Sequence, residues 1–162
     1  IGGGRNFNQG STSAGNPEIG TPVPIQQSPV FSKGDVLPAH DVLPPTSGPR
    51  YANPGPWGVS ELQLNDGLVV ANLERGAVVI NYNLPLDEGI SELTEFVKKL
   101  PGYPACIIQT PHSAVDLGSI TITSWGWTQT FTSFDSEGIE AFISSHKNKA
   151  PLYFGEDCGS GL

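Results

Sequence analysis

Three histidines are the side chains of this sequence best suited to moving protons or binding a metal: His40, His112 and His146. They lie far apart in the sequence and show no ligand-like spacing. Ser113 and Asp116 are close to His112, but a catalytic triad needs three groups that converge in space, which sequence neighbours do not guarantee. The sequence also lacks the GxSxG, Walker, HExxH and paired CxxC patterns. We therefore expect no catalytic activity, no metal and no cofactor.

Two further pairs of residues could carry chemistry or binding. Cys106 and Cys158 fit an exported protein with one disulfide, although two unrelated buried thiols fit the same sequence. Trp125 and Trp127 lie two residues apart, so on a strand they would share a face on which a surface glycan could stack. We favour the alternative that both tryptophans pack beneath a helix or an arm.

Composition and charge exclude several classes of protein. The net charge is −8 with a pI near 4.6, and no cluster of Lys or Arg occurs, so nucleic acid is a poor partner. No run of apolar residues is long enough to predict a membrane span. The chain holds no methionine, even at position 1. We therefore expect a processed product from which a secretion signal has been removed, and an extracellular or cell-surface location.

The elements that must position these side chains follow from hydrophobic periodicity. Residues 68–73 and 77–82 are apolar, β-branched runs separated by Gly76, which predicts a hairpin. Residues 87–100 and 136–146 have apolar positions at helical spacing, with Asp87 and Asp135 as N-caps. Further strands are predicted at 105–109, 119–125 and 127–131. The order β-β-α-β-β-α predicts an α+β fold, a mainly antiparallel sheet with two helices on one face.

The first 57 residues have a different composition, with 10 of the 15 prolines, 9 of the 20 glycines and only 6 charged residues. Such a segment buries too little apolar surface to fold alone, so to be ordered it must dock on something. We divide the chain into an extended arm (1–48), an α+β domain (49–150) and a C-terminal tail (151–162).

The stretch from Ile19 to Ile25 indicates how the arm docks. Its apolar residues alternate at the period of a strand, and Pro22 and Pro24 occupy the positions between them. A strand without these N–H groups can lie at the edge of a sheet but not in its middle. β-Augmentation of another sheet and a polyproline-type linker on the chain's own domain are both compatible with this pattern. The residues expected to anchor the arm are Ile19, Val23, Ile25, Val30 and Phe31.

Three motifs in order give the sequence a family resemblance: PPTSGPRY at 44–51, PWG at 56–58 and ANLERGAVVINY at 71–82. Over roughly residues 44–151 the chain resembles an exported bacterial family catalogued as domain of unknown function 3105. The motif positions are Pro45, Ser47, Gly48, Arg50, Tyr51, Trp57, Asn72, Glu74, Arg75 and Gly76. The resemblance implies histidine at three positions that are Arg50, Ala71 and Arg75 here. Arginine and alanine do not ligate metals, so any metal or proton-handling site of that family would be lost here.

These observations lead to one function hypothesis and one alternative. We expect a structural subunit of a secreted filament, a homopolymer in which the arm of one copy docks on the domain of the next. Surface glycans are a further partner that a low-charge arm rich in Ser and Thr would suit. The alternative is a monomeric exported domain that binds a small ligand or metal, with the arm folded back on itself. A hydrolase with an unrecognised site is a third and weaker hypothesis.

Overall fold

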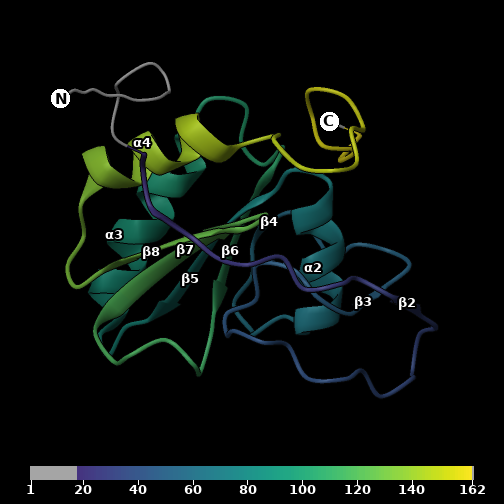
Figure 1. Ribbon diagram of the computed structural model, residues 1–162. Helices are drawn as coiled ribbons and strands as arrows, with labels where there is room; N and C mark the ends of the chain where they lie inside the picture. Colours follow the sequence, from purple (N-terminus) through teal and green to yellow (C-terminus); the bar gives the residue numbers. More distant parts are fainter. Residues whose placement is uncertain (1–17, 162) are drawn as a thin grey trace, which may run out of the picture.

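A mixed six-stranded sheet lies at the centre of the computed structural model, which describes residues 18–161 (Figure 1). The strands follow the order β1-β8-β7-β5-β6-β4 across this sheet, and β2 and β3 form a separate parallel pair. The strands are β1 (Thr21–Pro22), β2 (Val30–Phe31), β3 (Arg50–Tyr51), β4 (Gly58–Val59), β5 (Val78–Asn83), β6 (Ile107–Pro111), β7 (Ser119–Ser124) and β8 (Trp127–Phe131). The helices of the described residues are α2 (Asp66–Glu74), α3 (Asp87–Lys98) and α4 (Ser136–His146). None of them is long and apolar enough to cross a bilayer.

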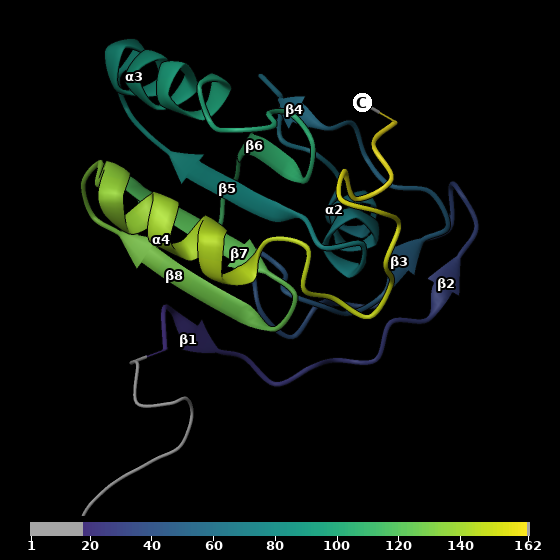
Figure 2. The same ribbon diagram turned by 90° about the horizontal axis from the view of Figure 1, so that it is seen from above.

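The handedness of parallel connections explains why helices cover both faces of the sheet. Strands β4, β6 and β5 are parallel, and the chain runs from β4 through α2 to β5 and then back through α3 to β6. Such crossovers are almost always right-handed. Because these two run in opposite directions across the sheet, their helices must lie on opposite faces. Figure 2 shows α2 on one side, and α3 and α4 together on the other.

Each face of the sheet has its own hydrophobic core. On the α3 and α4 face, Ile80 of β5 and Ile122 of β7 pack with Leu93, Val97 and residues of α4. On the α2 face, Val79 and Ile108 pack with residues of the helix. Alternate residues of β5 therefore enter different cores, as the period of a strand requires. Isoleucine and threonine alternate along β7, and Ile120 and Ile122 enter the first core.

The prediction of a hairpin over residues 68–82 is wrong, because its first half is helix α2. Asn65 caps this helix, its side chain accepting from the backbone N–H of Gly67 at 2.8 Å. Gly76 (φ +100°) does reverse the chain, but it ends the helix rather than a strand. Nearly the whole surface of α2 is buried, so its sequence has no polar face to reveal the helical period.

The remaining elements lie close to their predicted positions. Helix α4 has the predicted bounds and the predicted N-cap, Asp135. Helix α3 ends two residues earlier than predicted, and the prediction of Asp87 as its N-cap is wrong, because Leu86 is the N-cap and makes no side-chain cap hydrogen bond. Strands β6, β7 and β8 match the predicted runs within two residues at each end. The α+β class is therefore correct, and α3 and α4 do share a face. The predicted order of elements is wrong at α2, which replaces the first predicted strand. The sheet is mixed, because β4 and β5 are parallel to β6 while its other pairs are antiparallel.

The C-terminal tail loops over the end of α2 (Figure 1). The backbone N–H of Asn148 donates to the carbonyl of Gly76 at 2.8 Å, and that of Leu152 to the carbonyl of Glu74 at 3.0 Å. Cys106 and Cys158 form a disulfide that joins the tail to the start of β6. Of the two alternatives left open by the sequence, the structure has the paired cysteines.

Removing this disulfide should lower the free energy of unfolding. The bond spans 52 residues, so in the chain-entropy model it restricts the unfolded chain by about 4 kcal/mol. We expect the double variant Cys106→Ser/Cys158→Ser to lose roughly this amount in urea denaturation, with the reduced wild-type chain giving the same value. A Ser160→Ala variant in the same tail is the matched control. Unfolding free energies equal to that of the oxidised wild type would contradict the prediction.

Candidate functional site

The arm reaches the sheet at β8. Strand β1 lies antiparallel to β8, with Thr21 opposite Thr128 and Pro22 opposite Trp127. The N–H of Val23 continues this ladder by donating to the carbonyl of Gly126 at 2.8 Å. The backbone N–H groups of this segment that form hydrogen bonds point toward β8. The backbone nitrogens of Pro22 and Pro24, which carry no hydrogen, face the outer edge of the sheet. The prediction of an edge strand is confirmed, and in this single chain it is added to the chain's own sheet.

The first described residues of the arm are held by His146 at the end of α4. The imidazole lies between the rings of Trp127 and Phe142, with ring centroids 4.6 and 4.5 Å away. Its Nε2 is 2.7 Å from the carbonyl oxygen of Ile19 and donates to it. At Gly20 (φ +86°) a Cβ would lie 3.0 Å from the ring of Phe142, so the arm passes where only glycine fits without strain. We call the surface that receives the arm the arm groove: Gly126, Trp127, Thr128, Phe142 and His146.

Beyond the groove, the arm lies on the motif PPTSGP, whose residues 44–49 are all buried. The Ser47 hydroxyl accepts from the N–H of Gln26 at 2.8 Å, and the N–H of Gly48 donates to the Ser28 hydroxyl at 3.2 Å. The N–H of Arg50 donates to the carbonyl of Pro29 and continues into the β2–β3 pair. The motif therefore forms the surface on which the middle of the arm rests.

The five expected anchor residues are buried to different degrees. Ile19 packs against the core of the α3 and α4 face, and Val23 and Phe31 are half-buried. Ile25 covers Gly126 yet leaves 55% of its surface exposed, as does Val30. The part of the predicted arm before residue 18 lies outside the described residues.

A second feature is a hollow of about 350 Å³ beyond the carboxyl ends of β5 and β6. Polar groups of Glu61, Gln63 and Ser113 line it together with the apolar side chains of Leu84 and Ile90. Tyr82 also faces it, and burial, helped by the nearby Glu61 carboxylate, raises the pKa of this phenol. Crevices at the carboxyl ends of parallel strands are common places for ligands.

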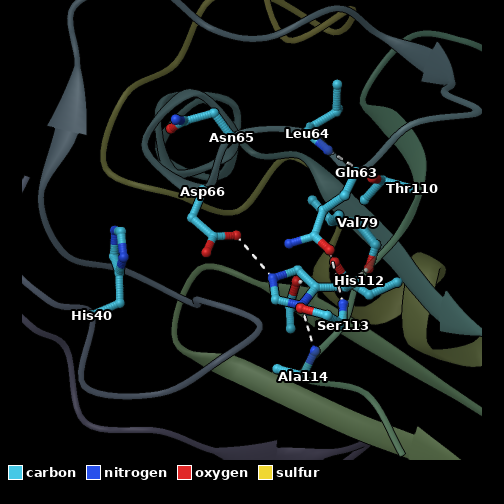
Figure 3. A network of polar contacts seen from close by, with 12 residues as sticks. His40, Gln63, Leu64, Asn65, Asp66, Val79, Thr110, His112, Ser113 and Ala114 are labelled. Atoms are coloured by element: carbon cyan, nitrogen blue, oxygen red, sulfur yellow. Dashed lines mark hydrogen bonds and ion pairs between the residues drawn. The ribbon is translucent and has the colours of Figure 1, made fainter. Parts of the chain in front are cut away.

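His112 borders this hollow but is fully occupied (Figure 3). Its Nε2 donates to Asp66 Oδ1 at 2.9 Å, and its Nδ1 accepts from the N–H of Ala114 at 3.1 Å. Neither ring nitrogen is left to accept a proton from a substrate or to bind a metal. The sequence neighbours Ser113 and Asp116 make no triad with it, since its carboxylate partner comes from the start of α2.

The other two histidines, His40 and His146, form hydrogen bonds with backbone carbonyls that hold the arm in place. His40 Nε2 bonds to the carbonyl of Pro49 at 2.9 Å, and His146 to Ile19 as described. Across residues 18–161, no group of three or more His, Cys, Asp or Glu side chains could hold a metal ion.

The motif residues of α2 and β3 gather where the helix meets the arm. Arg50 forms an ion pair with Glu74, and the Arg75 guanidinium stacks on Phe154 of the tail, 4.2 Å from the ring centroid. Burial and the neighbouring Arg50 lower the pKa of Arg75, and Glu74 opposes them. Arg50 is thus paired within the chain. Asn72, fully buried, binds both the N–H and the carbonyl of Gly55, at 2.7 and 3.1 Å.

Residues 39–158 match a family described as "Protein of unknown function (DUF3105)". The chain belongs to this family. No curated protein matches the sequence, and no solved structure matches the fold. The DUF3105 match therefore covers the PPTSGP motif, the three helices that the structure describes and the disulfide, and it begins after the first part of the arm.

Several interactions of the DUF3105 domain were not foreseen from the sequence: His146 with Ile19, Asn72 with Gly55 and Asp66 with His112. Only the last had a local signal, because Asp66 follows a good N-cap residue and so belongs to a first helical turn. The two tryptophans of the sequence 125–127 are half-buried and pack against opposite cores. This packing matches the alternative that we favoured over an exposed glycan-stacking pair.

His146 should make docking of the arm dependent on pH. Burial lowers the pKa of His146 from the ordinary value of 6.5, and the positive charge of Lys149 lowers it further. The hydrogen bond to Ile19 and the negative charge of Glu18 act in the opposite direction. The folded state therefore binds a proton less readily than the unfolded state. The contribution of His146 to the free energy of unfolding is therefore complete above the unfolded-state pKa of 6.5. It is lost as the pH falls from that value through the lowered pKa of the folded state.

We expect the free energy of unfolding, measured between about pH 8 and about pH 5, to fall more steeply for the wild type than for His146→Gln. Glutamine does not titrate and keeps an N–H donor for Ile19. The matched control His40→Gln should retain the wild-type slope. Equal slopes for His146→Gln and the wild type would show that this histidine does not couple docking to pH.

Proposed function

We propose that this chain is a structural subunit of a secreted polymer, in which the arm of one copy occupies the arm groove of the next. The observation that carries the proposal is the position of β1 as an added outer strand whose prolines face away from the sheet. Backbone hydrogen bonds to β8 supply affinity, and side chains at alternate positions supply fit, which is the arrangement of β-augmentation.

The segment that connects the arm to the domain can reach a neighbouring copy. Residues 32–43 lie between β2 and the buried PPTSGP motif, and most of them are exposed. Fully extended, they span about 40 Å, whereas a domain of this size has a radius of gyration of about 15 Å. The contacts of residues 19–31 are the same whether the groove belongs to the same chain or to another, as in other exchanged elements.

Five large apolar side chains of the arm are exposed in the single chain. Val36 is 92% exposed, and Leu43 is 52% exposed. Ile25, Val30 and Val42 are also exposed in the single chain. A neighbouring copy would cover this surface, which is more apolar than an arm lying permanently on its own domain needs to be.

The disulfide supports an exported location for the subunit. Disulfides persist in oxidising surroundings such as the cell surface and are rare in the cytosol. The hydrogen-bonded histidines support a structural role for these three residues, since general acid–base catalysis by histidine needs a ring nitrogen that can exchange a proton with substrate.

The cross-strand pair Thr21 and Thr128 provides a direct test. Cα partners in an antiparallel ladder lie about 4.5–5.5 Å apart, within reach of a disulfide. We expect chains carrying Thr21→Cys, mixed with differently tagged chains carrying Thr128→Cys, to form a covalent heterodimer of twice 17.1 kDa under oxidation. Negative-stain microscopy of the wild type should show filaments that disappear when residues 1–43 are removed.

The control mixture pairs Thr21→Cys with Ser91→Cys, an exposed position on α3, and should give only background cross-linking. The double variant Thr21→Cys/Thr128→Cys reports where the arm lies within one preparation. Closure entirely within single chains, with no heterodimer above the control, would rule out exchange of the arm.

The hollow beyond β5 and β6 favours a second candidate, a monomeric exported domain that binds a small molecule. Its volume of about 350 Å³ and its mixture of apolar walls and polar groups suit such a ligand. If the chain remains a monomer, solution NMR of Tyr82, Ser113 and Gln63 during a screen of small amines, sugars and carboxylates would test this function. No selective shift in these signals would remove it.

A further inference from the structure

The hollow beyond the carboxyl ends of β5 and β6 contains a tyrosine hydroxyl without a protein partner. Tyr82 and Pro111 form the last pair of the parallel ladder between these strands, and both line the hollow. The ring of Tyr82 packs in the core of the α3 and α4 face, and only 6% of the residue is exposed. Within residues 18–161, its hydroxyl forms no hydrogen bond. Because polar groups buried to this extent are normally paired, the hydroxyl marks a place for a ligand.

The carboxylate of Glu61 reaches the same hollow from a loop that is bonded to the end of β6. The N–H of Ser60 donates to the carbonyl of Gln109 at 2.8 Å. The side-chain carbonyl of Gln63 accepts from the N–H of Ser113 at 2.9 Å (Figure 3). After burial, the negative charge of Glu61 is the second cause of the raised pKa of the tyrosine phenol, so the two groups interact across the hollow. The loop therefore presents its carboxylate in a preformed site.

The charges around the hollow favour a positively charged ligand. Among the described residues, no lysine or arginine lines it. His112 at its border is paired with Asp66, and this pair adds no net positive charge. Glu88 and Glu92 line a neighbouring hollow, to which the described part of the chain again contributes no lysine or arginine. An ammonium group would meet a carboxylate and a phenol oxygen here, and charge-assisted hydrogen bonds are stronger than neutral ones.

Apolar side chains connect the two hollows. Leu84 lines both of them, and the second has a volume of about 530 Å³. Ile90 lines the first hollow, and Pro85 and Leu86 line the second. Because Leu86 is 59% exposed, a methylene chain lying here would remove apolar surface from water on both partners. The two hollows together suit a ligand with one polar end and an apolar stem.

We propose that these hollows bind an aliphatic primary amine, with its ammonium group between Glu61 and the Tyr82 hydroxyl and its stem across Leu84. This inference rests on the second candidate function, a small-molecule site, and names the class of ligand. It does not depend on exchange of the arm, because no residue of the arm or of the arm groove lines either hollow. Glu61 would repel a carboxylate, and a sugar would place its hydroxyl groups against the apolar walls.

Titration of the full chain with 1-hexylamine, followed by calorimetry and NMR at neutral pH, tests the proposal. The probes 1-hexanol and hexanoate have the same length but are neutral and anionic. We expect 1-hexylamine to shift the signals of Tyr82 and Gln63 and to bind about tenfold more tightly than 1-hexanol, because it adds a charge-assisted hydrogen bond. Hexanoate should not bind. Shortening the amine to 1-butylamine removes two methylenes and should weaken binding about tenfold.

Two variants test the polar end of the site. Glu61→Gln should weaken binding of 1-hexylamine about tenfold and leave that of 1-hexanol unchanged. Tyr82→Phe keeps the ring in the core and should weaken amine binding about threefold, since a single hydrogen bond is lost. The matched controls are Glu95→Gln, on α3 outside both hollows, and Tyr153→Phe, in the tail. Both should bind 1-hexylamine like the wild type.

The outcomes separate the class of ligand from the existence of the site. Equal affinities for 1-hexylamine and 1-hexanol, or an amine affinity that Glu61→Gln does not change, overturn the assignment of an amine. Selective shifts of Tyr82, Ser113 and Gln63 with a sugar, an alcohol or a carboxylate would then still support a small-molecule site. No shift of these signals with any of the probes overturns both.

Discussion

The burial of β5 on both faces is the constraint on which the rest of the structure depends. The strand is hydrogen-bonded to parallel β6 on one side and antiparallel β7 on the other. Its side chains enter two cores, and its polar residue Asn81 is satisfied by the carbonyl of Thr121 at 2.9 Å. Because α2 leads into this strand and α3 leads out, both faces must be covered by helices. The common direction of α2 and α3 follows from this one arrangement, because each connects parallel strands.

The arm depends on the same scaffold through the PPTSGP motif. This motif is buried and carries the middle of the arm, while β8 and α4 hold the first described residues of the arm. Docking therefore uses few large side chains and many backbone groups. An arm held in this way can dock on any copy that presents the same two surfaces, which links the DUF3105 motif to the proposed polymer.

Local sequence patterns predicted those parts of the fold in which one face meets water. Helices α3 and α4 have such a face, and their periodicity placed them closely. Strand β7 is buried along its whole length, but its alternating isoleucines and threonines still show the period of a strand. The edge position of β1 was also predictable, because prolines remove N–H groups regardless of tertiary context. Helix α2 was not, since burial all round removes the polar face and its valines favour a strand. Missing α2 also hid the partnership of Asp66 with His112, which depends on where the helix begins.

The prolines of the edge strand set the number of partners that one subunit can have. Once β1 is in place, Pro22 and Pro24 offer no N–H group to a further strand, so the sheet cannot continue to add strands at this edge. In the proposed polymer, each copy has one arm to give and one groove to fill, and is bifunctional in the sense of polymer chemistry. Growth by this contact would give unbranched chains with two distinct ends, one with a free arm and one with an empty groove. A short peptide with the sequence of residues 18–31 would then act as a chain stopper.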